Sequence, residues 1–255
     1  MKIRILGCGT SSGVPRIGND WGDCDPDNPR NRRLRQSAIV STQTTRILID
    51  TGPDMREQLL AAAVETVDAV IWTHAHADHC HGIDDLRQMM HALGRPVRGL
   101  ARPFAAEQIQ TRFDYIFHGR AGYRPSATME TLPDRLTIGD IEIAVVDQPH
   151  GGITSAGLCF TGPDGGTVGY STDCNALTEG MAATFAGIDL WVVDALRREP
   201  HPTHAHLAET LGWIERCAIA RAVLIHLDQS MDYATLCRDL PHGVVPGYDG
   251  MELAV

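Results

Sequence analysis

The feature that most constrains this chain is a dense cluster of metal-binding side chains at positions 73–79, Thr-His-Ala-His-Ala-Asp-His. The cluster follows a short apolar segment of the kind that forms a β-strand. Imidazole nitrogens and carboxylate oxygens are the ligands that zinc and similar divalent metals prefer. In a turn after a strand, His74 and His76 can face one metal, and as the chain begins to coil, Asp78 and His79 can face a second. The spacing therefore predicts a binuclear metal site at the end of a strand.

The rest of the chain alternates apolar, strand-like segments with helical ones. Strands are predicted at Lys2–Leu6, Ser37–Ser41, Arg46–Asp50, Asp68–Trp72, Ile141–Val146, Gly157–Phe160, Thr167–Ser171, Leu190–Asp194 and Ala222–His226. Helices are predicted after Pro53, near Asp84, from Pro103 toward Arg124, and at Glu179–Phe185, His206–Cys217 and Tyr233–Leu240. In each half the strands come first, which predicts two β-rich halves packed face to face with helices outside. No linker interrupts the chain, so residues 1–255 are expected to form one domain.

Composition narrows the compartment and the partners. No apolar run reaches the ~18 residues that a membrane span requires, and the amino-terminal segment lacks the apolar stretch of a secretory signal. The seven cysteines include no Cys-x-x-Cys pair, which favours free thiols in a reducing compartment. We therefore expect a cytoplasmic protein without membrane contact. Because the formal net charge is −10, we do not expect broad binding to the phosphate backbone of nucleic acid.

Two further segments are candidates for contact with an anionic substrate. One is a set of four arginines: Arg30, Arg32, Arg33 and Arg35. They are interpreted as a solvated or salt-bridged turn, with an anion-attracting rim as the alternative. The other is Tyr115–Tyr123, whose aromatic side chains can stack on a base while Arg120 or His118 meets phosphate. This segment is a candidate substrate cover, and a helix end packed on the core is the alternative.

The His-x-His-x-Asp-His run after a strand resembles the signature of the metallo-β-lactamase superfamily. That family places a histidine, then an aspartate, then a final histidine after three later strands. Here His150, Asp173 and His226 follow in that order, each near the end of a predicted strand. The resemblance spans nearly the whole chain. It implies a four-layer αββα sandwich, with the site where the strand ends of both sheets converge.

The resemblance also implies the ligands of two divalent ions, zinc or manganese. The first ion is held by His74, His76 and His150, the second by Asp78, His79 and His226, and Asp173 bridges the two. Such a set leaves open positions for water and substrate, as a catalytic site requires. Asp78 and His204 are the implied catalytic residues.

Three flanking motifs are similar to one branch, the phosphodiesterase of phosphonate catabolism that opens phosphoribosyl cyclic phosphate. They are Gly7–Pro15, Asp78–Arg87 and Gly247–Glu252. The implied reaction is hydrolysis of a small phosphodiester, a cyclic phosphate on a ribose-like sugar or nucleotide. Three alternatives remain: RNA processing of the ribonuclease Z kind, thioester or lactone hydrolysis, and a metal-binding accessory protein of cofactor biosynthesis. The sequence has no extended basic insertion of the kind that ribonuclease Z uses to grip transfer RNA. A homodimer is possible.

In that branch a histidine before a late helix lies near the scissile phosphate, and His204 is the match here, with His206 as the alternative. A protonated imidazole there can donate a proton to the leaving alkoxide. The branch also has a structural zinc held by cysteines of an early excursion and one later histidine. Here the excursion contains only Cys24, and Gln229 occupies the later position. We therefore expect no structural zinc, with polar contacts within Trp21–Arg35 in its place.

Overall fold

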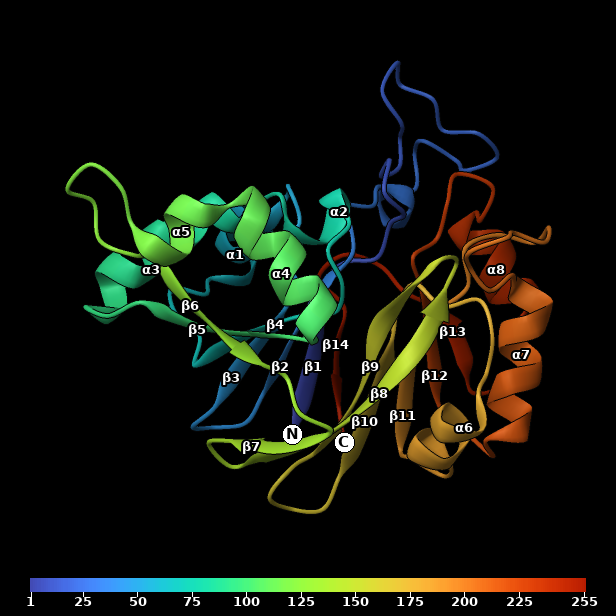
Figure 1. Cartoon of the computed structure of the whole chain (residues 1–255). Coiled ribbons are helices and arrows are strands. Elements are labelled where there is room, and N and C mark those ends of the chain that lie inside the picture. The colour runs from blue at the N-terminus through green and yellow to red at the C-terminus, as the bar shows by residue number, and fades with distance from the viewer.

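The computed structural model describes residues 1–255 and consists of two seven-stranded sheets between two layers of helices (Figure 1). The first sheet has the order β14 (Glu252–Ala254), β1 (Lys2–Gly7), β2 (Ser37–Ser41), β3 (Arg46–Ile49), β4 (Ala69–Trp72), β5 (Val97–Ala101) and β6 (Ala127–Thr131). The second has the order β13 (Val244–Pro246), β12 (Ala222–Ile225), β11 (Leu190–Asp194), β10 (Thr167–Ser171), β9 (Ile153–Thr161), β8 (Ile141–His150) and β7 (Arg135–Ile138). The predicted αββα sandwich is confirmed.

The helices cover the outer faces of the sheets. The first sheet carries α1 (Met55–Ala62), α2 (Ala77–Cys80), α3 (Leu86–Leu93), α4 (Pro103–Arg112) and α5 (Asp114–His118). The second carries α6 (Glu179–Phe185), α7 (Leu207–Arg216) and α8 (Tyr233–Asp239), and single 3-10 turns occur at Pro29–Asn31 and Ile83–Asp85. No helix has both the length and the apolar character that crossing a membrane requires.

The inter-sheet core joins the two halves of the chain. Ile5 and Val40 of the first sheet belong to the same buried cluster as Val145 and Phe160 of the second. Separate apolar clusters lie beneath the helices on each outer face. Burial of one large apolar side chain contributes about 1.5–3 kcal/mol to the free energy of unfolding. The three clusters therefore hold the two sheets and the helices together, and this fixes the position of the strand ends.

The sequence pattern missed five strands, β5, β6, β7, β13 and β14. The last two are only three residues long, and β6 is mostly exposed, so their pairing depends on distant partner strands rather than on an apolar pattern. Strand β8 also extends beyond the predicted end at Val146. Its residues 147–150 pair with β9 up to His150 opposite Ile153, which carries the histidine to the tip of a hairpin.

Parallel pairing brings the functional ends of the strands together. Strand β3 is parallel to β4, and β10, β11 and β12 are mutually parallel, so their carboxyl ends lie at one edge of each sheet. Three residues just past such ends, Asp50, Asp173 and His226, have positive φ angles of 63°, 53° and 58°. Residues other than glycine adopt this region uncommonly, and strained positions of this kind cluster at functional sites.

The early excursion rises above the strand ends beside α8 (Figure 1) and is held by a buried arginine. Arg33 is only 1% exposed. Its guanidinium donates hydrogen bonds to the backbone carbonyls of Asp228 at 3.0 Å and Met231 at 2.5 Å. The thiol sulfur of Cys24 lies 3.7 Å from the same guanidinium. Arg33 is therefore neither in a solvated turn nor on a rim, because its donors satisfy carbonyls of the loop that follows β12.

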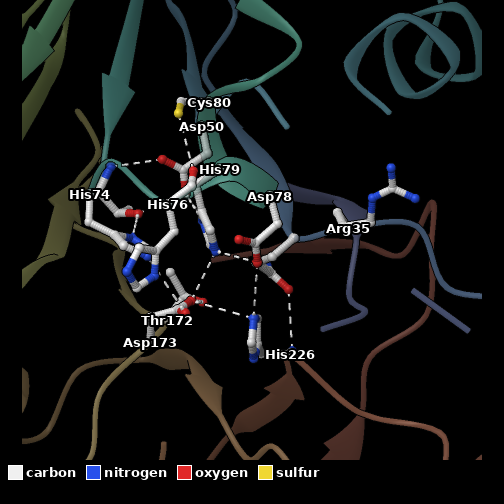
Figure 2. Close-up of polar contacts among 12 residues, drawn as sticks. Arg35, Asp50, His74, His76, Asp78, His79, Cys80, Thr172, Asp173 and His226 are labelled. Atoms are coloured by element: carbon white, nitrogen blue, oxygen red, sulfur yellow. Dashed lines mark hydrogen bonds and ion pairs between the residues drawn. The ribbon is translucent and has the colours of Figure 1, made fainter. Parts of the chain in front are cut away.

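The neighbouring arginines are also engaged within the protein. The Arg30 guanidinium lies 4.9 Å from the ring centroid of Tyr233 and 4.8 Å from that of Tyr248. The Arg35 Nε is 3.1 Å from a carboxylate oxygen of Asp54, and its guanidinium points away from the metal-binding side chains (Figure 2). The alternative of an anion-attracting arginine rim is therefore not supported for Arg30, Arg33 and Arg35.

Replacing Arg33 by methionine should lower the free energy of unfolding by about 3 kcal/mol, because two buried carbonyls lose charge-assisted hydrogen bonds. Urea denaturation measures the difference. The matched control is Arg32→Met, since Arg32 is exposed and only lies over the Trp21 ring at 5.3 Å. The control should lose less than about 1 kcal/mol. Equal, small losses in both variants would contradict the anchoring role of Arg33.

Candidate metal centre

The structure brings all seven predicted ligands together. Figure 2 labels all of them except His150 and shows their side chains converging. The side chains fall into groups whose ligand atoms lie within 4.8 Å of one another. The first group is His74, His76, His150 and Asp173, and the second is Asp78, His79 and His226. The first set contains the three histidines predicted for one metal together with the predicted bridging aspartate. The second set matches the ligands predicted for the other metal.

A buried aspartate that the sequence analysis did not single out orients His79. Asp50, at the end of β3, is fully buried, and its Oδ2 accepts a hydrogen bond from His79 Nδ1 at 2.7 Å. The backbone N–H and the hydroxyl of Thr73 also donate to this carboxylate, at 2.7 and 2.8 Å. With Nδ1 engaged, His79 Nε2 faces Asp173 Oδ2 at 3.1 Å. A carboxylate behind the imidazole fixes the tautomer that a metal requires.

The other side of the centre is oriented in the same way. His150 Nδ1 donates to the carbonyl of Thr203 at 2.8 Å, which leaves its Nε2 facing Asp173 Oδ1 at 3.6 Å. The hydroxyl of Thr172 donates to Asp173 Oδ2 at 2.6 Å. These contacts fix the carboxylate of Asp173 between the two histidine groups, the position that a bridging ligand needs.

A second buried aspartate, Asp194, supports the predicted catalytic histidine. It ends β11 and accepts hydrogen bonds from His204 Nδ1 at 3.0 Å and from the backbone N–H of Cys174 at 3.2 Å. Its other oxygen lies 3.8 Å from His226 Nδ1. The rings of His204 and His226 stack with centroids 4.7 Å apart. Like Asp50, Asp194 follows an apolar strand directly, a signal that the sequence contains.

The donor atoms fit a divalent cation. The Nε2 atoms of His74, His79 and His226 are buried and make no well-aligned hydrogen bond, although oxygens of Asp173 lie 3.7, 3.1 and 3.6 Å away. A cation between these nitrogens and the carboxylates would satisfy both. Burial, then the neighbouring imidazole of His79, holds the pKa of His74 well below its usual value, so His74 is neutral and can coordinate. Burial alone would lower the pKa of His79, yet the surrounding carboxylates, first that of Asp173, raise it well above the ordinary value. The centre therefore attracts positive charge.

Cys80 follows the ligand run directly but does not join it. Its thiol is directed at the carbonyl of His76, 3.1 Å away (Figure 2). Burial raises the pKa of the Cys80 thiol to about 11, so the group stays protonated at neutral pH. Its contact with this carbonyl therefore stabilises the turn between the predicted ligands His76 and His79.

A hollow of about 280 Å³ opens onto the ligands. His76, the one exposed member of the first group, lies at its mouth. Three further predicted ligands line it from α2 and from the ends of β10 and β12: Asp78, Asp173 and His226. The other lining residues come from the glycine-rich first loop, the β8–β9 hairpin and the segment before α7, and they are Ser11, His150, Gly151, Gly152, Ile153, Thr203 and His204. His204 is therefore at the hollow, where the resemblance predicts it.

Two other predicted candidates lie elsewhere. His206 Nδ1 is 2.6 Å from Glu209 Oε2 in the first turn of α7, so its ring is engaged at the start of that helix. Within the segment Tyr115–Tyr123, Ile116 and Phe117 are buried in the core beneath the helices. No residue of that segment lines the hollow at the ligands. The substrate-cover hypothesis is therefore not supported, and the packed-helix alternative describes α5.

Comparisons with known proteins agree with this geometry. Residues 45–227 match the family model described as the beta-lactamase superfamily domain. A solved structure described as a new diphosphatase from the PhnP family has a TM-score of 0.90 and 30% identity, covering 100% of this chain and 97% of that one. Zn²⁺-bound PqqB from Methylobacterium extorquens has a TM-score of 0.80 and 20% identity over 100% of both chains, which shows the same fold.

A curated relative extends beyond this chain. An octanoyltransferase from Porphyromonas gingivalis is 30% identical over 266 residues, an alignment that covers 100% of this chain and 52% of that protein. The chain thus spans about half the length of that relative.

Replacing Asp50 by asparagine should weaken metal binding by about 10- to 100-fold, because His79 loses the carboxylate that fixes its orientation. Competition with a chelator of known affinity measures the change. The matched control is Asp134→Asn, since Asp134 is 85% exposed and pairs only with Arg102. Unchanged metal affinity in the Asp50 variant would refute the orienting role.

Proposed function

Because this chain belongs to the beta-lactamase superfamily and gathers two sets of metal-binding side chains at one edge, we propose that it is a metal-dependent hydrolase of small phosphodiesters. The observation that carries the proposal is His204, a histidine backed by a buried carboxylate and facing the same hollow as the ligand groups. The proposal assigns the seven clustered side chains to two divalent ions, zinc or manganese. Such ions supply an activated water and neutralise charge on the substrate oxygens.

His204 would act as the proton donor. Its Nδ1 is engaged by Asp194, so Nε2 faces the hollow, 3.8 Å from Asp173 Oδ1. The hydrogen bond to Asp194 holds the ring in this orientation, from which a protonated Nε2 can give its proton to the leaving alkoxide. The ring is 12% exposed, so a substrate can reach it while the stack on His226 keeps it in place.

The lining of the hollow supports a small substrate. Besides the ligands and His204 it consists of Ser11, Thr203, the Gly151–Gly152 pair and one apolar residue, Ile153. No arginine or lysine lines it to hold a further phosphate, and no tryptophan, tyrosine or phenylalanine lines it to stack a base. A volume of about 280 Å³ suits one phosphodiester on a sugar-sized group. The cyclic phosphate of a ribose-like sugar has this size and charge.

The same lining bears on RNA processing. The turn between β8 and β9 consists of Gly151 and Gly152 alone, so no arm extends there beyond the hollow. This turn favours a small molecule over a transfer RNA. Acyl hydrolysis remains as a second candidate because of the octanoyltransferase relative, whose name implies acyl chemistry. A non-enzymatic accessory role is the third outcome that an assay must separate.

Turnover of bis(p-nitrophenyl) phosphate, a thioester and a lactone by metal-stripped protein refilled with manganese or zinc tests the proposal. Metal-dependent cleavage of the diester alone is the expected result. Cleavage of only the carbonyl substrates would move the function to acyl hydrolysis. Inactivity on all three would favour the accessory role.

His204→Ala should lower kcat on the diester by about 10²- to 10⁴-fold, the usual contribution of a general acid. Metal content, measured by elemental analysis, should stay unchanged. His206→Ala is the matched control, because that ring contacts Glu209 instead of the hollow. The control should keep kcat within about threefold, since surface changes away from the chemistry have small effects. Full turnover in the His204 variant would remove the residue from the mechanism.

A further inference from the structure

Two adjacent hollows occupy the helical layer of the first sheet, away from the metal centre. One, of about 370 Å³, is bounded by α3 and the turn before β6, and the other, of about 230 Å³, lies across that turn toward α5. Arg87, Tyr123 and Arg124 line both. The larger is within the range of about 300–1,000 Å³ that small-molecule sites occupy. Together they form one bipartite site, which we call the arginine–tyrosine pocket.

The pocket is lined by positively charged side chains, whereas the protein as a whole is acidic. Arg87, Arg120 and Arg124 line it, and no acidic side chain does, although the chain carries a net charge of −10. Asp84 is the nearest acidic partner, 3.9 Å from the Arg87 guanidinium, and it also accepts a hydrogen bond from the Tyr115 hydroxyl at 2.8 Å. Neither the Arg120 nor the Arg124 guanidinium has an ion-pair partner within 4.0 Å. Three guanidinium groups gathered in this way favour an anion between them.

An exposed aromatic ring separates the two hollows. Tyr123 is 72% exposed, and the Arg87 guanidinium lies 5.6 Å from its ring centroid. The turn that presents the ring is tight, because the Arg120 and Tyr123 backbones exchange hydrogen bonds and Ala121 has a positive φ of 50°. Met90 and His91 of α3 line the larger hollow together with this ring. A planar group can therefore stack there while its anionic end reaches the arginines.

The pocket is separate from the proposed hydrolytic site. In Figure 1 the turn before β6 projects beyond α3 and α5, at the opposite end of the helical layer from α2. The two sites share no lining residue. An occupant of the pocket therefore binds independently of the metals.

We propose that the arginine–tyrosine pocket binds a nucleoside monophosphate. The base stacks against Tyr123 in the larger hollow, and the phosphate lies between Arg87, Arg120 and Arg124 in the smaller one. Guanidinium groups bind phosphate oxygens with paired N–H donors. The inference does not depend on the reaction at the metal centre.

Isothermal titration of the metal-loaded protein with adenosine 5′-monophosphate tests the proposal. We expect saturable binding with a Kd below about 1 mM, and about tenfold weaker binding of ribose 5-phosphate, which lacks the stacking base. Tyr123→Ala should remove this preference and leave the affinity for ribose 5-phosphate unchanged. Arg120→Glu and Arg124→Glu should each weaken both probes at least about tenfold, since each replaces an attraction by a repulsion.

Two controls separate the pocket from other sources of binding. Arg135→Glu makes the same charge change at an exposed position of β7 and should leave both affinities unchanged. His76→Ala alters the metal centre and should also leave them unchanged. Absence of binding at about 1 mM ligand would overturn the proposal. So would binding that survives both arginine variants or is lost in His76→Ala.

Discussion

The balance of buried charge at the strand ends controls the rest of this structure. Asp50, Asp173 and Asp194 are at most 2% exposed, and a buried carboxylate is costly unless donors or cations surround it. Hydroxyl and backbone N–H groups donate some of the hydrogen bonds that these carboxylates need, and imidazoles donate the others. Asp50 and Asp194 each accept a hydrogen bond from the Nδ1 of one histidine, so the Nε2 atoms of His79 and His204 are directed toward Asp173. The histidines that stabilise the buried carboxylates therefore also supply the inward-facing nitrogen atoms of the candidate metal centre.

The fold contributes the strand ends and the connections that hold the surrounding loops. The carboxyl group of Asp249 accepts backbone hydrogen bonds from Cys8 at 3.0 Å and Leu34 at 2.7 Å, and burial raises its pKa to about 6. The backbone N–H of Leu227, next to His226, donates to the Cys8 carbonyl at 2.9 Å. The first loop, the excursion and the last ligand strand are thus joined through the carboxyl-terminal segment. This joining positions the glycine-rich loop as one wall of the hollow.

Reaction type and substrate choice depend on different parts of this molecule. The ligand groups belong to a superfamily fold that accommodates several kinds of hydrolysis, because an activated water attacks phosphorus and carbonyl carbon alike. Under the function proposed above, selection among substrates rests on the small polar hollow and on His204 as the proton donor. The arginine–tyrosine pocket shares no lining residue with that hollow, so the chain has room for recognition apart from its chemistry.

The sequence by itself predicted the layer order and the ligand run His74, His76, Asp78 and His79, because this run follows an apolar strand and its spacing is local. His150, Asp173 and His226 were implied by the resemblance, and the structure brings them to the same cluster. The sequence also contained His204, although only a resemblance distinguished this residue from His206. Only the tertiary structure decided that Asp50 and Asp194 support the site, that Arg33 anchors the excursion, and that the Tyr115–Tyr123 segment lies away from the ligands. Each of these depends on which distant backbone or side chain lies opposite. A local pattern carries no information on that pairing, because strand registers and layer packing fix it across separations of up to about two hundred residues, as between Arg33 and Met231.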